Sequence, residues 1–212
     1  KNLPSVSILS TGGTISSKVD YRTGGVYADY TASDFLIMCP ELRDIANINA
    51  HKAMSLMSED MLPRDWIGMA KIIENEIKKK VDGIVVTHGT DTLHFSTAAL
   101  SFMLEEFNIP IIFTGSQRSI DRGSSDAFFN LSCAVKAAAQ SDIAEVMTCM
   151  HGTSNDDYCL LIRGTKVRKM HTSRRDAFRP INETALAKVY PDKIEILNQE
   201  YKKTDRMNKS KV

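Results

Sequence analysis

The stretch "DGIVVTHGTDTLHFSTAAL", residues 82–100, decides the fold class of this chain. Its first part is an apolar run without polar alternation, which is typical of a parallel strand buried on both faces. Residues 88–92 then bring histidine, glycine, threonine and aspartate together, and a helical pattern follows them. One polar residue is enough to cap a helix, so the surplus indicates a functional site as well as a turn.

Apolar runs alternate with helical patterns on both sides of this stretch. Further strands are predicted at residues 5–10, 50–57, 109–116 and 143–150. Helices are predicted at residues 31–42, 62–80, 91–107 and 124–140. This order predicts an α/β fold, with a doubly wound, flavodoxin-like and mostly parallel sheet that carries helices on both faces and ends in a hairpin.

Local signals set the expected limits of these helices. Ser33 is the predicted N-cap of the first helix, and Pro40 is expected to end it. Pro63 suits the first turn of the second helix. Ser124 or Ser125 is the predicted N-cap of the last one.

The C-terminal part has a different pattern. Residues 158–171 predict a hairpin that turns at Gly164, and residues 184–201 predict one or two more strands. We expect one N-terminal α/β domain over residues 1–190. Residues 191–212 are expected to be a linker or the start of a smaller C-terminal domain, partly disordered because the tail is charged.

Composition excludes several function classes. The chain has 212 residues, of which 42% are hydrophobic and 25% charged, and its net charge of +1 gives no global attraction to nucleic acid or membrane. The four cysteines lack CxxC or Cys/His spacing, so they are expected to be core thiols of a cytoplasmic protein. No apolar run reaches the roughly 18 residues that a membrane span needs.

Polar residues gather where the predicted strands end. In a parallel sheet, ligands bind at the carboxyl ends of the strands, near a topological switch point. The loops at those ends are "STGGTISS" (10–17), "LMSEDM" (56–61), "THGTDT" (87–92) and "TGSQRSIDRGSSD" (114–126). Their hydroxyls, glycines and carboxylates are almost missing from the strand interiors, so we expect a shared site at this edge.

The "TGGT" loop offers Thr14 as a candidate nucleophile, although a tight turn would also explain its glycines. It matches neither GxGxxG nor GxxxxGK[ST], so a phosphate site is not indicated. A threonine hydroxyl needs a base close by. His88, Lys166 and Lys169 are candidates, but a histidine beside a strand is usually structural. The two lysines face opposite sides of an alternating strand, and the sequence does not choose between them.

Three motifs, "STGGTISS", "VVTHGTDTLHFSTAAL" and "PIIFTGSQRSIDRGSSDAFFNL", resemble the N-terminal domain of the asparaginase/glutaminase family. Both threonine motifs occur in order, each after a predicted buried strand, over a resemblance that spans about residues 4–190. The resemblance implies acyl transfer from a side-chain amide. It implies no metal and no organic cofactor in this chain.

The resemblance also implies roles for single residues. Thr14 would be the nucleophile, and Thr90, Lys169 and Asp91 would form a proton-relay group.

The remaining implied roles concern substrate binding. Ser58 and Glu59 would hold the α-carboxylate and α-amino group, with Asp91 also on the amino group, and backbone N–H groups at Gly89 and Thr90 would stabilise the oxyanion. The family also uses a tyrosine from the loop after the first motif, for which the candidates are Tyr21 and Tyr27.

A narrower resemblance concerns "SKVDYRTGGV", "MSEDM", "GSQRSIDRGSSDA" and "VRKMHTSRRDAFRPIN". These segments are similar to the asparaginase-like, D-type subunits of archaeal glutamyl-tRNA(Gln) amidotransferases. This implies an amidase that releases ammonia from glutamine or asparagine. A partner, the E-type subunit of the amidotransferase, would use ATP and Mg to convert Glu-tRNA(Gln) into Gln-tRNA(Gln), and tRNA(Gln) would be bound mainly by that partner. A homodimer within a heterotetramer, away from membranes, is implied.

Two alternatives stay open. One is a stand-alone cytosolic L-asparaginase with the same chemistry, and the other is a non-catalytic scaffold fragment. The basic run at residues 163–179 favours a tRNA enzyme, although a solvated loop explains it equally well. The smaller C-terminal family domain, and the small β-barrel that precedes the asparaginase part in the D-type proteins, are expected to be largely absent from this sequence.

Overall fold

A computed structural model describes residues 3–19, 22, 26–28 and 32–205 of the chain. Within these residues the main sheet has eight strands. Its strands are β1 (Ser5–Gly12), β4 (Asn47–Leu56), β5 (Gly83–Thr87), β6 (Ile111–Thr114), β7 (Val146–His151), β8 (Cys159–Arg163), β11 (Ala187–Val189) and β12 (Ile194–Ile196). Two small sheets pair β2 (Ser17–Val19) with β3 (Val26–Ala28), and β9 (Val167–Lys169) with β10 (Phe178–Pro180).

The strand order across the sheet is β12-β11-β8-β7-β6-β5-β1-β4. Strands β4, β1, β5, β6 and β7 are parallel neighbours, whereas β8, β11 and β12 continue the sheet in antiparallel fashion. In chain order the parallel part runs 2-1-3-4-5, which is the flavodoxin-like doubly wound order. The predicted fold class is confirmed, and β1 next to β5 is the switch point.

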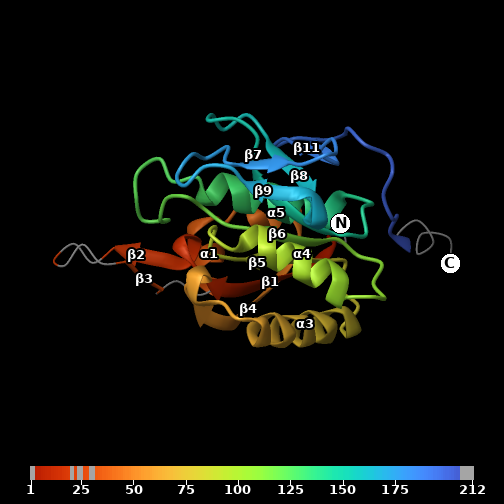
Figure 1. Cartoon of the computed structure of the whole chain (residues 1–212), viewed down its shortest axis with the longest axis horizontal. Helices are drawn as coiled ribbons and strands as arrows, with labels where there is room; N and C mark the ends of the chain where they lie inside the picture. The colour runs from red at the N-terminus through yellow and green to blue at the C-terminus, as the bar shows by residue number, and fades with distance from the viewer. Residues whose placement is uncertain (1–2, 20–21, 23–25, 29–31, 206–212) are drawn as a thin grey trace.

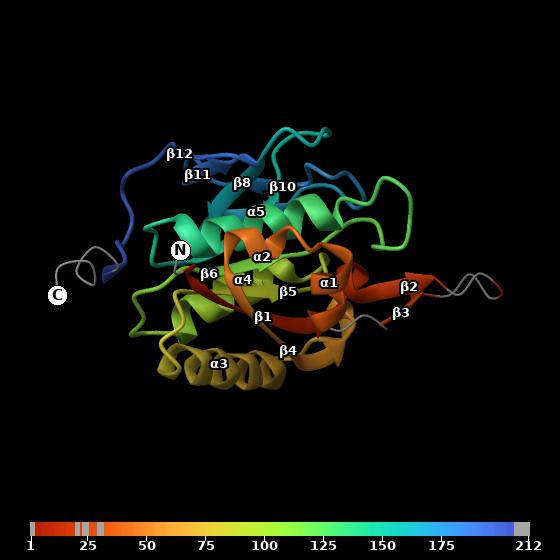
Figure 2. The same cartoon turned by 180° about the vertical axis from the view of Figure 1, so that it is seen from behind.

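Helices cover both faces of the sheet (Figures 1 and 2). They are α1 (Ala32–Met38), α2 (Leu42–Ile45), α3 (Pro63–Lys78), α4 (Leu93–Met103) and α5 (Ala127–Gln140). The 3-10 turns are η1 (Thr14–Ser16), η2 (Ser58–Asp60) and η3 (Gly164–Lys166). Helices α1, α2 and α5 pack on one face, and α3 and α4 pack on the other.

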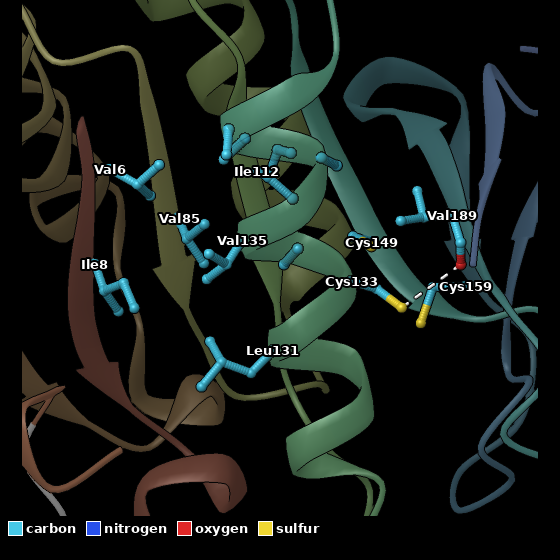
Figure 3. Packing of buried hydrophobic residues seen from close by; sticks show 14 of the residues in the cluster. Val6, Ile8, Val85, Ile112, Leu131, Cys133, Val135, Cys149, Cys159 and Val189 are labelled. Carbon is cyan, nitrogen blue, oxygen red and sulfur yellow. Dashed lines mark hydrogen bonds between the residues drawn. The ribbon is translucent and has the colours of Figure 1, made fainter. Parts of the chain in front are cut away.

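The sheet has a hydrophobic core on each side. Val85 points toward α5, where it lies near Leu131 and Val135 (Figure 3). Its neighbours Ile84 and Val86 belong to the core under α3 and α4. Because successive side chains of a strand point to opposite faces, consecutive positions of β5 must be apolar, as Ile84, Val85 and Val86 are. This explains the unbroken run that indicated a doubly covered strand.

Helix α3 has one buried acid on its apolar face. Pro63 occupies its first turn, as predicted, and Met69 and Ile73 are buried against the sheet. Glu76 is buried beside them and accepts hydrogen bonds from Ser7 Oγ at 2.7 Å and Lys79 Nζ at 2.6 Å. Burial opposes ionisation of Glu76, but the hydrogen bonds from Lys79 and Ser7, together with the charges of Lys79 and His51, outweigh it and lower its pKa.

Two predicted N-caps are wrong. Helix α1 begins at Ala32, so Ser33 is a helical residue and not the N-cap. The N-cap of α5 is Asp126, not Ser124 or Ser125. The side chain of Asp126 makes no capping bond, because it accepts hydrogen bonds from the preceding loop instead.

The predicted hairpin at Gly164 is also wrong. Strand β8 pairs with β7 and β11 of the main sheet, whereas β9 leaves the sheet and pairs with β10. Turn η3 redirects the chain at Gly164, where an added Cβ would lie 2.8 Å from the carbonyl oxygen of Val146 and 2.9 Å from that of Thr97. The glycine therefore serves close packing and not a hairpin turn.

The structure carries the main sheet past residue 190. Strands β11 and β12 form an antiparallel pair, which fulfils the prediction of further strands near the C-terminus. Ala144 N–H also donates to the carbonyl of Lys202 at 2.7 Å. Whether a smaller domain begins in 191–212 stays a prediction, and the charged tail from residue 206 lies outside the described residues.

The described helices are short or polar. Among them, no helix is long and apolar enough to cross a membrane. All four cysteines are buried free thiols, as their spacing predicted, and Cys133, Cys149 and Cys159 lie around α5, β7 and β8 (Figure 3).

Candidate functional site

The loops after β1, β4 and β5 meet at contacts that only glycine allows. Gly13 has φ +79°, and an added Cβ would lie 2.4 Å from Cα of Gly89. A Cβ added to Gly89 would in turn lie 2.6 Å from both Cβ and Oγ of Ser58. Left-handed φ values and such close approaches are the two situations that favour glycine. Residues 13, 58 and 89 therefore form one contact line, although three different loops supply them.

Two hydrogen bonds strengthen this convergence. Thr11 Oγ1 donates to the carbonyl of Thr87 at 2.8 Å, which ties the end of β1 to the end of β5. Thr92 Oγ1 donates to the carbonyl of Ser58 at 2.8 Å, which ties the loop after β5 to η2. Thr92 therefore supports the local structure of this loop.

Lys169 reaches this edge of the sheet from β9. Its Nζ donates to Thr90 Oγ1 and to Asp91 Oδ1, both at 2.8 Å. The Lys169 side chain is 8% exposed and Thr90 is buried, whereas the Asp91 side chain is 64% exposed. Of the two lysines that the sequence left open, Lys169 and not Lys166 thus has its amine on the "GTDT" motif.

Thr14 lies at the start of η1, directly after Gly13. It is half-buried, and the turn that holds it is closed by a hydrogen bond from Ser16 N–H to the carbonyl of Gly13 at 3.0 Å. Since Gly13 contacts Gly89, the residues that precede Thr14 and Thr90 are in direct contact. The structure thus brings the two threonine motifs together.

The other predicted substrate-binding residues differ in their surroundings. Ser58 is buried at the start of η2, and the next residue, Glu59, is exposed. Of the two candidate tyrosines, Tyr27 belongs to β3, whose side chains lie outside the described part of the structure. Tyr21 lies outside the described residues altogether.

His88 is a buried structural group, as predicted. Its Nδ1 lies 2.7 Å from the carbonyl of Gly89, and its Nε2 lies 2.8 Å from Ser96 Oγ. Trp66 Nε1 donates to the same Ser96 Oγ at 2.8 Å. A carbonyl only accepts and an indole N–H only donates, so Nδ1 carries the proton and Ser96 donates to Nε2. Burial lowers the pKa of His88 to about 4, although its bond to Gly89 opposes this.

His94 lies in the first turn of α4, beside the lysine. Burial, and then the nearby charges of Arg168 and Lys169, lower its pKa. It lines an open hollow of ≈ 270 Å³ together with Asp91, Lys169, Met170, His171 and Thr172. The hollow gives the Asp91 and Lys169 pair access to a small ligand.

Sequence reasoning missed Gln117 and Asp126. Gln117 Oε1 accepts a hydrogen bond from Thr90 Oγ1 at 3.1 Å. Asp126 is buried and accepts from the backbone N–H groups of Gln117 and Arg118 at 2.9 and 3.0 Å. Both residues lie in the loop at the carboxyl end of β6, where a site is expected. This position does not single them out, because all thirteen residues of the loop at 114–126 have it.

The arginines of the basic run at residues 163–179 are mostly paired within the chain. Their acidic partners are Glu145 and Glu183 for Arg163, Asp156 for Arg175, and Asp176 for both Arg174 and Arg179. The run is therefore less of a free positive surface than its composition indicated. Among the described residues, no group of three or more His, Cys, Asp or Glu side chains is placed to hold a metal ion.

A doubly wound sheet whose switch-point loops join two threonine motifs to a lysine is the arrangement expected of an asparaginase-like domain. The chain belongs to the asparaginase family, because residues 5–202 match the model of the asparaginase N-terminal domain. Solved structures agree with this. The thermostable L-asparaginase from Thermococcus kodakarensis has a TM-score of 0.83 and 32% identity, over 93% of this chain and 57% of that one. A probable cytoplasmic L-asparaginase from Campylobacter jejuni has a TM-score of 0.79 and 25% identity, over 92% and 57%.

Curated relatives identify the narrower group. The chain is 55% identical over 201 residues to the D-type subunit of the glutamyl-tRNA(Gln) amidotransferase of Methanothermobacter thermautotrophicus, which covers 95% of this chain and 46% of the relative. It is 56% identical over 194 residues to the corresponding protein of Methanosarcina mazei, with 92% and 45% covered. The chain thus spans about half the length of the curated relatives it matches. The predicted resemblance to the archaeal D-type proteins is confirmed.

Proposed function

We propose that this chain is the amidase part of a tRNA-dependent amidotransferase, and that it releases ammonia from the side-chain amide of glutamine or asparagine. The observation that carries the proposal is the position of Lys169 Nζ, which bonds both Thr90 Oγ1 and Asp91 Oδ1 at 2.8 Å. A lysine amine on a threonine hydroxyl provides a route for protons at the edge where Thr14 lies. The similarity to the D-type amidotransferase proteins supports the choice of reaction.

The reaction has two steps. Thr14 Oγ attacks the amide carbon, the C–N bond breaks, and ammonia leaves after taking up a proton. Water then attacks the resulting Thr14 ester, which returns the threonine hydroxyl and releases glutamate or aspartate. Thr90 and Lys169 carry protons in both steps, and backbone N–H groups at Gly89 and Thr90 are the candidate donors for the oxyanion.

The binding of the amino acid follows from charge. Asp91 is exposed beside the hollow next to Lys169, so its carboxylate can accept from the α-ammonium group of a substrate. Ser58 and Glu59 lie on η2, which the contact between Ser58 and Gly89 holds against the same edge. We assign to them the substrate's α-carboxylate and α-amino group.

The proposed complex supplies what this chain does not. A partner, the E-type subunit of the amidotransferase, would activate Glu-tRNA(Gln) with ATP and Mg and would use the released ammonia to form Gln-tRNA(Gln). No cofactor is assigned to this chain, and tRNA(Gln) would be held mainly by the partner. The complex would contain this chain as a homodimer within a heterotetramer in the cytoplasm.

A Thr14→Ala variant of the full gene product, purified with its partner, tests the proposal. We expect the unmutated complex to release ammonia from glutamine or asparagine, and the variant to retain less than about 1% of that rate because it has no nucleophile. Thr165→Ala is the matched control, because Thr165 is an exposed residue of η3. Equal rates for Thr14→Ala and the control would remove Thr14 from the mechanism.

A stand-alone L-asparaginase is the second candidate, and the similarity to the Thermococcus kodakarensis enzyme supports it. The two candidates differ in their dependence on a partner. The amidotransferase proposal predicts that the E-type partner and Glu-tRNA(Gln) raise ammonia release. Strong asparagine hydrolysis that is indifferent to both would favour the second candidate.

A further inference from the structure

Gln117 connects the proposed proton relay to a neighbouring loop. It lies three residues after β6 and is half-buried. Its Oε1 accepts a hydrogen bond from Thr90 Oγ1 at 3.1 Å, and its Nε2 donates to the carbonyl of Arg174 at 2.9 Å. One side chain thus bridges the hydroxyl of Thr90 and the segment that follows Lys169.

The direction of each bond is fixed by its partners. The carbonyl of Arg174 can only accept, so the Gln117 nitrogen must face it and the Gln117 oxygen must face Thr90. Lys169 Nζ donates to Thr90 Oγ1 at 2.8 Å, so the Thr90 oxygen is the acceptor of that bond. The hydroxyl proton of Thr90 therefore points to Gln117 Oε1.

The backbone of Gln117 is held as firmly as its side chain. Buried Asp126 accepts its N–H at 2.9 Å and that of Arg118 at 3.0 Å. Asn130 Nδ2 donates to the same carboxylate at 3.3 Å and to the carbonyl of Gly115 at 2.9 Å. The loop is anchored from helix α5, so Gln117 does not depend on substrate for its position.

We propose that Gln117 is a positioning residue that holds the proton of the Thr90 hydroxyl, so that Thr90 presents an acceptor to the incoming nucleophile. A hydroxyl has one proton and two lone pairs. The Thr90 hydroxyl donates its proton in a hydrogen bond to Gln117, and one of its lone pairs accepts from Lys169. The second lone pair is left to accept from the hydroxyl of Thr14 or from the attacking water. Without Gln117, the Thr90 hydroxyl is free to rotate and can present its proton where an acceptor is needed.

This role rests on the proposed amidase function, and two variants of the full complex separate it from simple loop anchoring. Gln117→Leu removes both side-chain bonds, whereas Gln117→Glu keeps an oxygen that faces Thr90 but places a second acceptor against the carbonyl of Arg174. We expect Gln117→Leu to lower kcat about tenfold with KM within about twofold, and Gln117→Glu to keep most of the rate. A role limited to anchoring Arg174 predicts a loss for Gln117→Glu at least as large as the loss for Gln117→Leu.

The control is Gln140→Leu, the same chemical change at the exposed C-terminal end of α5, about 20 Å along the helix from Asp126. It should leave kcat and KM unchanged. The coupling to Thr90 is tested in a Thr90→Val background, where no hydroxyl proton remains to be held. There Gln117→Leu should change the residual rate by less than about twofold. A tenfold loss in both backgrounds would overturn the proposal.

A measurement that does not need activity separates this role from the amidase function itself. Neutron diffraction of the deuterium-exchanged protein locates the hydroxyl deuterium of Thr90, and we expect it on the side of Gln117 Oε1. A deuterium that points elsewhere overturns the role of Gln117, even if the complex is active. Absence of ammonia release from the unmutated complex, with the deuterium on Gln117, overturns the amidase proposal and leaves the orientation established.

Discussion

Gly89 touches Ser58 so closely that a single added methyl group would lie 2.6 Å from both Cβ and Oγ of that serine. Its φ is not in the left-handed region that Gly12 and Gly13 adopt, so the requirement at Gly89 is for space alone. The contact sets the distance between the "HGTDT" loop and η2. It also makes the geometry of the site sensitive to one methyl group.

We therefore expect Gly89→Ala to lower the free energy of unfolding by about 1–3 kcal/mol and to reduce ammonia release, because the two loops must move apart. Gly68→Ala is the matched control, since a Cβ there would meet nothing within 4 Å and Gly68 lies inside α3. That control should stabilise the protein by about 0.5–1 kcal/mol. Urea unfolding of both variants measures the difference, and equal effects would refute the crowding at Gly89.

Removal of the relay amine should separate activity from stability. Lys169→Met is expected to lower ammonia release about 100-fold or more, because proton transfer loses its amine. The free energy of unfolding should change by no more than about 1 kcal/mol, since Asp91, the partner of Lys169, is mostly exposed. Lys166→Met, three residues earlier, is the control. Wild-type rates from Lys169→Met would show that the protons move by a route without Lys169.

The buried imidazole of His88 predicts a loss of stability in acid. Burial holds the pKa of His88 at about 4 in the folded state, against about 6.5 when unfolded, so between these values only the unfolded chain gains a proton. The stability present above pH 6.5 is therefore lost as pH falls to about 4, by about 3 kcal/mol. Urea unfolding from pH 7.5 to 4.5 should show a shallower pH dependence for His88→Gln than for the wild type. His51→Gln, at an exposed position, should keep the wild-type slope.

The buried acid of α3 can be examined through its partner on β1. Glu76→Leu leaves the buried Ser7 hydroxyl without its acceptor, which should cost about 1–3 kcal/mol of unfolding free energy. Adding Ser7→Ala removes the unpaired hydroxyl and should recover part of that loss. A double-mutant cycle by urea unfolding measures the coupling, and strictly additive effects would show that the hydrogen bond contributes nothing.

The elements that could be predicted from sequence are those whose pattern is local. The apolar runs of β5 and β6 and the amphipathic face of α3 contain their own signal, because each position faces a core or water according to its period. The hairpin at Gly164 failed because the partner of a strand is chosen by the whole sheet. Strand β8 pairs with β7 and β11, and the residues around Gly164 contain no signal for this pairing.

Only part of the site could be predicted, because most of its contacts join segments that are far apart in the sequence. Thr90, Asp91 and Lys169 were found through motif resemblance, and their contact spans 79 residues of sequence, which no local pattern encodes. Gln117 was missed because every polar residue of its loop fits a turn equally well. Asp126 was also missed, since its hydrogen bonds to the preceding loop depend on the folded arrangement of that loop against α5.

Trp66 is the only tryptophan of the sequence, and its indole N–H bonds to Ser96, which bonds to His88 and through it to the carbonyl of Gly89. The tryptophan fluorescence of this chain therefore comes from a side chain that three hydrogen bonds connect to the backbone of the site. Stopped-flow emission can follow substrate arrival or the protonation of His88 without a dye or a chemical label. Trp66 is thus a natural fluorescent probe whose environment is coupled to the proposed site.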